Sequence, residues 1–249
     1  MVNRYTAVIG FETHIQVLTK TKLFCGCKNI FGAPPNSVVC PICLGMPGVL
    51  PALNIEVVKK AIKTAIILNC TINEVSFFDR KNYFYPDIPK SYQITQYHKP
   101  IAQNGYVELS TGKKIRIKRF HIEEDVGKLL HPELGKAKDG SYDLGIIRAD
   151  YSFVDMNRSG VPLFEIVTEP DIENSEEGYE YLVNLKRLLQ FSGISNCDME
   201  KGQLRCDVNI SIKKIDSDTL SNRVEIKNLN SFKFVKDAIN FEIARQIET

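Results

Sequence analysis

The stretch Arg119-Phe-His-Ile-Glu-Glu-Asp-Val-Gly-Lys128 decides how the rest of the sequence is interpreted. It contains a histidine, a lysine and a run of three acids, Glu123, Glu124 and Asp125. Adjacent carboxylates repel one another, so they usually persist only where water solvates them or a cation neutralises them. The stretch therefore indicates either a solvated acidic turn at a strand end or part of a Mg²⁺ site, since Mg²⁺ prefers oxygen ligands.

Further acids lie on segments that read as strands. Residues 7–17 alternate between apolar and polar side chains, which predicts a strand with one buried face. The polar face of this strand carries Glu12 and His14 side by side. Glu165 lies within an apolar strand expected at 161–167, where a carboxylate is costly unless it is paired or bound to a metal.

Two more alternating segments, 204–212 and 223–227, carry Asp207 and Glu225 on their polar faces. In a mainly antiparallel sheet the apolar faces rest on helices, and the polar faces combine into one surface. That surface would repel itself without metal ions, so we expect two Mg²⁺ ions and a bound nucleotide there. The residues assigned to it are Glu12, His14, Glu123, Glu124, Glu165, Asp207 and Glu225.

Four cysteines gather near the N-terminus, in the pairs Cys25-Gly-Cys27 and Cys40-Pro-Ile-Cys43. Two close pairs that bracket a short loop are typical of a tetrahedral structural zinc site. Unliganded core thiols or a redox pair are the alternatives. We expect Cys25, Cys27, Cys40 and Cys43 to bind Zn²⁺ in a loop inserted at 24–45.

The predicted fold class is therefore α+β: a mainly antiparallel β-sheet with helices packed on one face and a small zinc-binding insert. Residues 132–149 are expected to form a polar loop. Helices are expected from Ile55 to about Leu68, after Asn174 up to Gly193, and from Ser231 onward. The first helix is expected to bury one stripe made of Val58, Ala61, Ile62, Ala65 and Ile66.

Bases and aromatic residues interleave in the segment 79–97. Aromatic side chains offer stacking planes for bases, and lysine or arginine side chains offer partners for phosphates. An aromatic loop packed on the core is the alternative interpretation. The residues concerned are Arg80, Lys81, Tyr83, Phe84, Tyr85, Lys90, Tyr92 and Tyr97.

Composition excludes several classes of protein. With 249 residues, 43% of them hydrophobic, the chain is long enough for one large domain. A net charge of +2 gives no strongly basic field, and no apolar run approaches the roughly 18 residues that span a bilayer.

The chain lacks a G-x-x-x-x-G-K-[ST] loop, a G-x-G-x-x-G turn and a G-x-S-x-G elbow. It also shows no signal-peptide pattern, and its odd cysteine count suggests a reducing compartment.

In order along the chain, several long motifs resemble the family of the B subunit of the aspartyl/glutamyl-tRNA amidotransferase. The resemblance runs from about residue 5 to the end of the chain. The motifs are Val8-Ile-Gly-Phe-Glu-Thr-His14, Phe78-Asp-Arg-Lys-Asn-Tyr-Phe-Tyr-Pro-Asp87, His121-Ile-Glu-Glu-Asp-Val-Gly-Lys128, Asp155-Met-Asn-Arg158, Glu165-Ile-Val-Thr-Glu-Pro-Asp171, Leu204-Arg-Cys-Asp207 and Glu225-Ile-Lys-Asn-Leu-Asn-Ser-Phe232.

This resemblance implies a ligase that forms a C–N bond, of the glutamine-hydrolysing glutaminyl-tRNA synthase type. The side-chain carboxylate of Glu or Asp misacylated on tRNA(Gln) or tRNA(Asn) is phosphorylated by ATP, and ammonia from a partner amidase then displaces the phosphate. The implied partners are the amidase subunit (A), a small subunit (C) and the tRNA, with no membrane. The implied cofactors are ATP, Mg²⁺ and structural Zn²⁺, in the bacterial cytoplasm or an organelle.

The resemblance also implies a domain organisation and individual roles. Residues 1–249 correspond to the family's kinase-like cradle domain, whereas its C-terminal helical and tail domains have no counterpart here. Catalysis and Mg²⁺ binding fall to Glu12, His14, Glu123, Glu124, Glu165, Asp207 and Glu225. We expect ATP or the tRNA end to be bound by Arg80, Lys81, Tyr83, Tyr85, Lys90, Tyr92, Arg158, Arg205 and Lys227.

Two functions of other classes stay open. A zinc-containing RNA-binding module without catalysis needs a basic surface, which the net charge of +2 does not support. A metal-dependent phosphodiesterase could use the same acids, and it would hydrolyse its substrate without any acyl acceptor. The related subunit of the archaeal, Gln-specific amidotransferase is an alternative within the same class.

Overall fold

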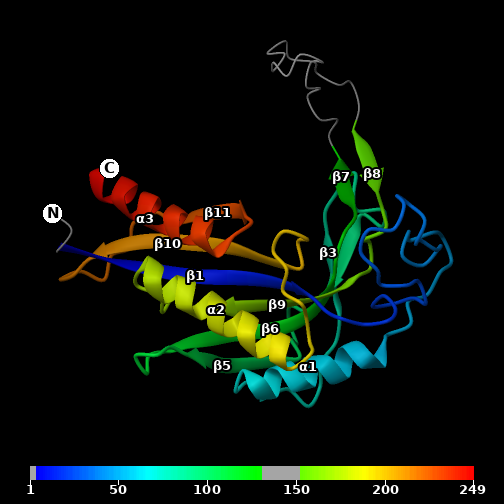
Figure 1. Ribbon diagram of the computed structural model, residues 1–249, viewed down its shortest axis with the longest axis horizontal. Coiled ribbons are helices and arrows are strands. Elements are labelled where there is room, and N and C mark those ends of the chain that lie inside the picture. The colour runs from blue at the N-terminus through cyan, green and yellow to red at the C-terminus, as the bar shows by residue number, and fades with distance from the viewer. Residues whose placement is uncertain (1–3, 131–151) are drawn as a thin grey trace, which may run out of the picture.

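A computed structural model of the chain describes residues 4–130 and 152–249. The polar loop predicted at 132–149 lies outside the described residues. In the described part the fold is α+β, as predicted, with one large antiparallel sheet and three helices (Figure 1). No helix among these residues is long and apolar enough to cross a membrane.

Within residues 4–130 and 152–249, the main sheet is antiparallel and has seven strands. Two small two-stranded sheets accompany it among the described residues, β3 (Asp79–Asn82) with β4 (Tyr92–Thr95) and β7 (Lys128–Leu130) with β8 (Phe153–Asp155). The order in the main sheet is β11 (Val224–Leu229), β10 (Leu204–Lys214), β1 (Tyr5–Gln16), β9 (Pro162–Thr168), β6 (Lys114–Glu124), β5 (Ala102–Glu108) and β2 (Thr71–Ile72).

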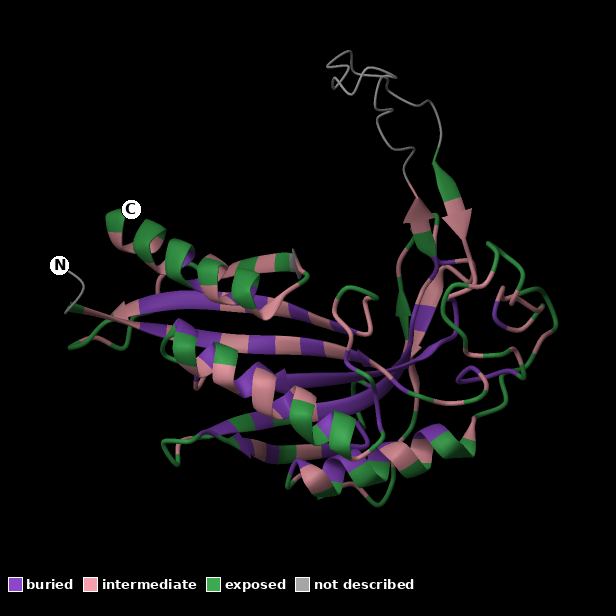
Figure 2. Ribbon diagram, in the orientation of Figure 1, coloured by how far each residue is buried: buried purple, intermediate pink, exposed green. Residues whose placement is uncertain are grey.

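Strand β1 confirms the predicted alternation, because every second residue of Tyr5–Gln16 is buried from Ala7 on. Its apolar side chains Ile9, Phe11 and Ile15 are fully buried in the core. The intervening side chains are only partly covered, so the strand has one core face and one accessible face (Figure 2). This alternation places Glu12 and His14 of β1 away from the core.

The three helices of the described residues cover the apolar face of the sheet: α1 (Ile55–Ile67), α2 (Ser175–Phe191) and α3 (Phe232–Glu248). Each begins at a side-chain cap, where Asn54, Asn174 and Ser231 accept hydrogen bonds from backbone N–H groups. The predicted helices are thus confirmed. Their buried residues join the strands in one hydrophobic core.

Helix α2 packs closely against β1. A Cβ added at Gly178 would lie 2.8 Å from Cζ of Phe11, so only glycine lets the two backbones approach this far. The Tyr181 ring meets the Phe11 ring edge to face, with centroids 5.9 Å apart. The contact fixes the helix layer on the sheet.

The buried stripe predicted for α1 is partly wrong. Ile62 and Ile66 are 38% and 65% exposed, whereas Val57, Ala61 and Ala65 are fully buried. Residues 57, 61 and 65 recur at intervals of four and share one face of a helix, and positions 62 and 66 lie one residue, or about 100°, further round. The helix therefore turns its smaller apolar residues inward.

Candidate metal and nucleotide site

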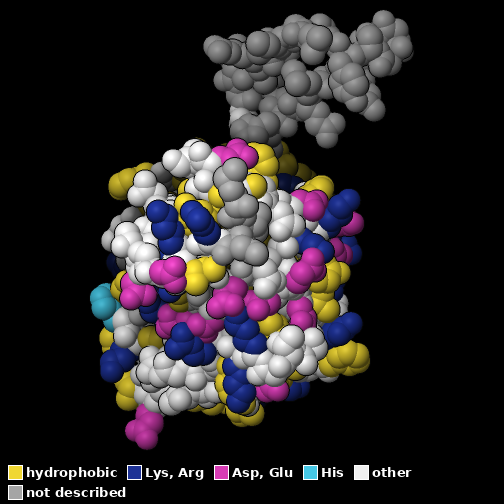
Figure 3. Space-filling model, turned by 90° about the vertical axis from the view of Figure 1, so that its left-hand side faces the viewer, with side chains coloured by type: hydrophobic (Ala, Val, Ile, Leu, Met, Phe, Trp, Pro, Cys, Tyr) yellow, Lys and Arg dark blue, Asp and Glu magenta, His cyan; other side chains and the backbone are white. Residues whose placement is uncertain are grey.

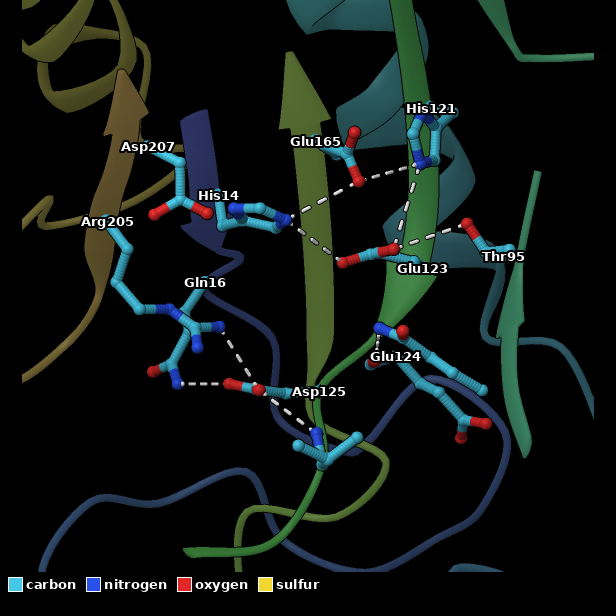
Figure 4. Close-up of polar contacts among 12 residues, drawn as sticks. His14, Gln16, Thr95, His121, Glu123, Glu124, Asp125, Glu165, Arg205 and Asp207 are labelled. Atoms are coloured by element: carbon cyan, nitrogen blue, oxygen red, sulfur yellow. Dashed lines mark hydrogen bonds and ion pairs between the residues drawn. The ribbon is translucent and has the colours of Figure 1, made fainter. Parts of the chain in front are cut away.

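Side chains from three neighbouring strands meet on the polar face of the sheet. The imidazole Nε2 of His14 lies 3.4 Å from Oε2 of Glu165 and 3.6 Å from Oε1 of Glu123. On the other side, Nε2 of His121 lies 3.3 Å from Oε2 of Glu165 and 3.7 Å from Oε2 of Glu123 (Figure 4). We call His14, His121, Glu123 and Glu165 the four-residue cluster.

Strand register creates this cluster. Glu165 on the central strand β9 is the direct partner of His14 on β1 and of His121 on β6. Glu123 follows His121 by two residues on β6, so both side chains point to the same face. All members lie on strands of one sheet, so hydrogen bonding between strands holds their spacing.

Three members of the cluster are buried, and His14 is partly exposed. Burial tends to lower the pKa of His14, but the hydrogen bond to Glu165 and the nearby charge of Glu123 outweigh it and raise that pKa. For His121 burial opposes the shift in the same way, and the same two carboxylates raise its pKa to about 9. The two imidazoles hold the pKa of Glu165 well below its usual range, against the effect of burial. The carboxylates thus favour the protonated form of each imidazole.

This cluster has the donor atoms for a divalent cation. One ligand atom each from His14, Glu123 and Glu165 lies within 4.8 Å of the others. The two carboxylates suit Mg²⁺ or Mn²⁺, and the imidazole is a ligand more typical of transition metals. The set therefore fits a single divalent cation, provided that the imidazole of His14 gives up its proton.

The remaining predicted acids of the polar face lie further along it. Glu12 on β1 is the direct partner of Asp207 on β10. Lys227 on β11 lies 3.5 Å from Oδ2 of Asp207 and 3.1 Å from Oε1 of Glu225. The hydrogen bond to Glu225 raises the pKa of Lys227. The structure thus brings Glu12, Asp207 and Glu225 to the same surface as the cluster, with a lysine between the last two.

Glu124 does not join this surface. The prediction put Glu123 and Glu124 together, but consecutive residues of a strand point to opposite faces. Glu124 follows Phe120 and Ile122, which face the core. Its carboxylate forms a buried ion pair with Lys90 and accepts a hydrogen bond from the Ile94 N–H at 2.9 Å. Burial raises the pKa of Glu124, although the Lys90 ammonium opposes this shift.

Asp125 anchors two arginines that were predicted to bind ATP or the tRNA end. Oδ1 of the fully buried Asp125 lies 3.1 Å from the Arg205 guanidinium, and Oδ2 lies 3.5 Å from that of Arg158. Gln16 donates to the same carboxylate at 2.9 Å (Figure 4). Burial alone would raise the pKa of Asp125, and these arginines lower it instead. Arg205 is also the direct partner of His14, which brings a guanidinium beside the cluster.

A cleft of about 800 Å³ opens beside this surface. Its volume is in the usual range for a small-molecule site. Acidic and basic side chains are intermingled on the end of the molecule in Figure 3, with no continuous basic area there. Of the residues discussed, the cleft is lined by His14, Gln16, Arg158, Arg205, Asp207 and Lys227.

The basic and aromatic segment forms the β3–β4 hairpin and the loop that joins its strands. The Arg80 guanidinium lies over the Tyr92 ring at 4.8 Å and the Lys81 ammonium near the Tyr83 ring at 5.7 Å. Tyr85 is 60% exposed. None of these predicted ATP- or tRNA-binding residues lines the 800 Å³ cleft.

The four cysteines lie together as predicted, with one sulfur from each within 4.8 Å of the others. The Cys40 N–H donates to the Cys43 sulfur at 3.1 Å, and the buried Lys22 ammonium lies 3.6 Å from the same sulfur. A hydrogen bond from Cys25 lowers the pKa of Cys43 to about 4 against the effect of burial, and Lys22 adds to that shift. These donors stabilise a thiolate, the form that binds metal, so the group fits a structural Zn²⁺ ion.

Sequence reasoning missed two residues of the polar surface. His121 was available from the alternation, because it shares its strand face with Glu123. Asp125 gave no such signal, because it lies just after β6 and its partners come from elsewhere in the chain.

Comparison with known proteins assigns a family. The chain matches the GatB/GatE catalytic domain over residues 7–249. It is 51% identical over 248 residues to the B subunit of the aspartyl/glutamyl-tRNA(Asn/Gln) amidotransferase from Caldanaerobacter subterraneus subsp. tengcongensis, and the match covers 98% of this chain and 49% of that relative. The protein of the same name from Thermotoga petrophila is 51% identical over 249 residues, 98% of this chain and 50% of the relative. The chain thus spans about half the length of the curated relatives it matches.

Proposed function

Because the chain belongs to the GatB/GatE catalytic domain family, we propose that it carries the ATP-dependent phosphorylation step of a tRNA-dependent amidotransferase. The substrate is the side-chain carboxylate of Glu or Asp misacylated on tRNA(Gln) or tRNA(Asn). The observation that supports this most strongly is the donor set of His14, Glu123 and Glu165, with His14 on the wall of the 800 Å³ cleft.

The chemistry explains why such a site is needed. A carboxylate is a poor electrophile, because an amine would have to expel an oxide ion from it. Transfer of the γ-phosphoryl group of ATP to a carboxylate oxygen forms an acyl phosphate and ADP. Ammonia then attacks the acyl carbon, phosphate leaves, and the nitrogen loses a proton to give the amide. Phosphorylation thus converts a poor leaving group into a good one.

Residues of this chain have separate parts in that step. His14, Glu123 and Glu165 would hold one divalent ion, and Glu12, Asp207 and Glu225 offer oxygens for a second. Such ions neutralise charge, so that the anionic carboxylate can approach an anionic phosphate. Arg205 and Lys227 line the cleft and would bind phosphate oxygens. Asp125 holds Arg205 in place through its buried carboxylate.

The family resemblance supplies the partners of the proposed reaction. Ammonia would come from an amidase subunit (A), which acts together with a small subunit (C). The cysteine group would hold one structural Zn²⁺ ion. Because the ion supports the loop around it, that loop should depend on zinc for its fold.

Reconstitution with candidate A and C subunits tests the proposal. Phosphate release from ATP should require misacylated tRNA and a divalent ion, and it should be accompanied by formation of Gln-tRNA or Asn-tRNA. Assays with Glu-tRNA(Gln) and Asp-tRNA(Asn) in parallel identify the substrate. Phosphate release at the same rate without any misacylated tRNA would contradict the proposal and favour nucleotide hydrolysis.

A further inference from the structure

We propose that Lys90 is a positioning residue. Through its buried ion pair with Glu124, it couples the loop 24–45 that carries the four cysteines, here called the insert, to Glu123. The proposal rests on the function proposed above, because it concerns binding of a divalent ion by the four-residue cluster. Loss of zinc from the insert should then weaken binding of a divalent ion by the four-residue cluster, although the cysteine group and the cluster share no residue.

The first link is the contact between the insert and Lys90. Gly45, just beyond Cys43, has a positive φ of +67°, and a Cβ there would lie 3.1 Å from Cβ of Lys90 and 3.2 Å from its Cα. The backbone of the insert therefore rests directly on Lys90. Cys43, Gly45, Lys90 and Glu124 also line one small cavity of about 80 Å³.

The second link is the ion pair between Lys90 and Glu124. Their side chains are only 8% and 3% exposed. A buried charge without its partner is strongly unfavourable, so separating these two side chains would be costly. The insert lies against this ion pair. If the insert became disordered, the ion pair would be exposed to water.

The third link joins Glu124 to Glu123. Gln93 donates to the backbone oxygen of Glu124 at 2.7 Å, and the Ile94 N–H donates to its carboxylate at 2.9 Å. Thr95, next on strand β4, donates to Oε2 of Glu123 at 3.2 Å (Figure 4). Strand β4 thus holds both consecutive acids at once, one on each face of β6, and Lys90 lies two residues before β4.

These links form one continuous path from the cysteines to the cluster. The insert packs against Lys90, and Lys90 forms an ion pair with Glu124. Strand β4 then positions Glu123 at the distance from His14 and Glu165 that a shared ion needs. The path assigns Glu124 a positioning role on the core side of β6, apart from the residues that would touch the ion.

Binding of Mn²⁺ to the protein tests this coupling, with zinc content measured on the same samples. Mn²⁺ affinity is measured by calorimetry or by electron paramagnetic resonance for the wild type, Lys90→Met and the surface control Lys59→Met. Lys90→Met should bind Mn²⁺ at least about 10-fold more weakly while keeping its zinc, and Lys59→Met should match the wild type. Lys90→Met affinity within twofold of the wild type would overturn the coupling.

Two further variants keep the test decisive. If Lys90→Met does not fold, Lys90→Met/Glu124→Leu replaces the ion pair by apolar side chains, which a core often tolerates. This double variant should fold and keep zinc yet bind Mn²⁺ weakly, and wild-type affinity would overturn the coupling. Glu165→Gln tests whether Mn²⁺ binds at the cluster, and it should weaken Mn²⁺ binding because Glu165 is a proposed ligand. A wild type that binds no Mn²⁺ would instead contradict the proposed function itself.

Discussion

His14 on β1 and Glu165 on β9 are direct cross-strand partners, and Nε2 of the imidazole lies 3.4 Å from Oε2 of the carboxylate. The candidate site is therefore built on the sheet itself, and loops contribute little to the cluster. Sites on regular strands hold their geometry more accurately than sites on loops. Mutations that leave the sheet intact should therefore report on chemistry more than on folding.

The cysteine group should hold one zinc ion that contributes to folding. Cys40→Ser should reduce zinc from about one ion per chain to almost none and lower the free energy of unfolding by about 2 kcal/mol or more. Elemental analysis and urea denaturation measure the two effects. Cys70→Ser, outside the group, is the matched control and should keep its zinc. Full zinc content in Cys40→Ser would contradict the assignment.

The stability of the protein without divalent ions at the cluster should depend on pH through His121. Its pKa is raised to about 9 in the folded state, against about 6.5 in an unfolded chain. A raised pKa contributes stability that is fully present below pH 6.5 and is lost as the pH rises through 9. We expect a loss on the order of 3 kcal/mol across this range.

Urea denaturation of zinc-loaded protein in Mg²⁺-free buffer, at pH 6 and pH 9.5, checks this expectation. His121→Gln should remove most of the pH dependence, because its side chain does not titrate. An equally steep pH dependence in His121→Gln would show that the stability comes from other groups.

The close contact of α2 with β1 predicts that Gly178→Ala destabilises the protein. Alanine normally favours a helix over glycine, but here the added methyl group would lie 2.8 Å from Phe11 and 3.2 Å from Cδ1 of Ile239. We expect a loss of about 1–3 kcal/mol, measured by chemical denaturation. Arg187→Ala on the exposed side of α2 should change stability by less than about 0.5 kcal/mol. A more stable Gly178→Ala variant would contradict the packing described here.

The buried carboxylate of Asp125 should be essential for the fold around Arg158 and Arg205. Asp125→Asn keeps the shape but removes the charge that balances two guanidinium groups, so we expect a loss of about 3–5 kcal/mol. The exposed Asp237→Asn is the control and should be nearly neutral. If Asp125→Asn unfolds at the same urea concentration as Asp237→Asn, the Asp125 carboxylate does not stabilise the fold around Arg158 and Arg205.

Sequence alternation predicted the strands and the side of each strand on which its acids lie. It identified Glu12, His14, Asp207 and Glu225 because a period of two separates the two faces of a strand. Glu165 was identified differently, because a carboxylate within an apolar strand is costly unless it is paired or bound to a metal. The same rule, applied to 119–128, would have separated Glu123 from Glu124 and paired Glu123 with His121. That error arose from treating adjacent acids as one unit.

Other features depend on contacts between distant parts of the chain. The order β1–β9–β6 brings His14, Glu165 and His121 together, and local patterns do not specify which strands become neighbours. The pairing of Lys90 with Glu124 likewise joins residues 34 positions apart, with Gly45 packed against Lys90. In α1, the exposure of Ile62 and Ile66 follows from which face meets β5 and β6, which periodicity alone leaves open.

The central claim is that the four-residue cluster supports phosphoryl transfer to an acyl acceptor. Its most direct test is the rate of phosphate release from ATP, dependent on misacylated tRNA, in a complex reconstituted with A and C subunits. Glu165→Gln should lower that rate by about 100-fold or more, leave glutamine hydrolysis by the amidase largely intact and keep the fold. The exposed Glu74→Gln variant should match the wild type in all three respects. A folded Glu165→Gln complex that releases phosphate at the wild-type rate would contradict the claim.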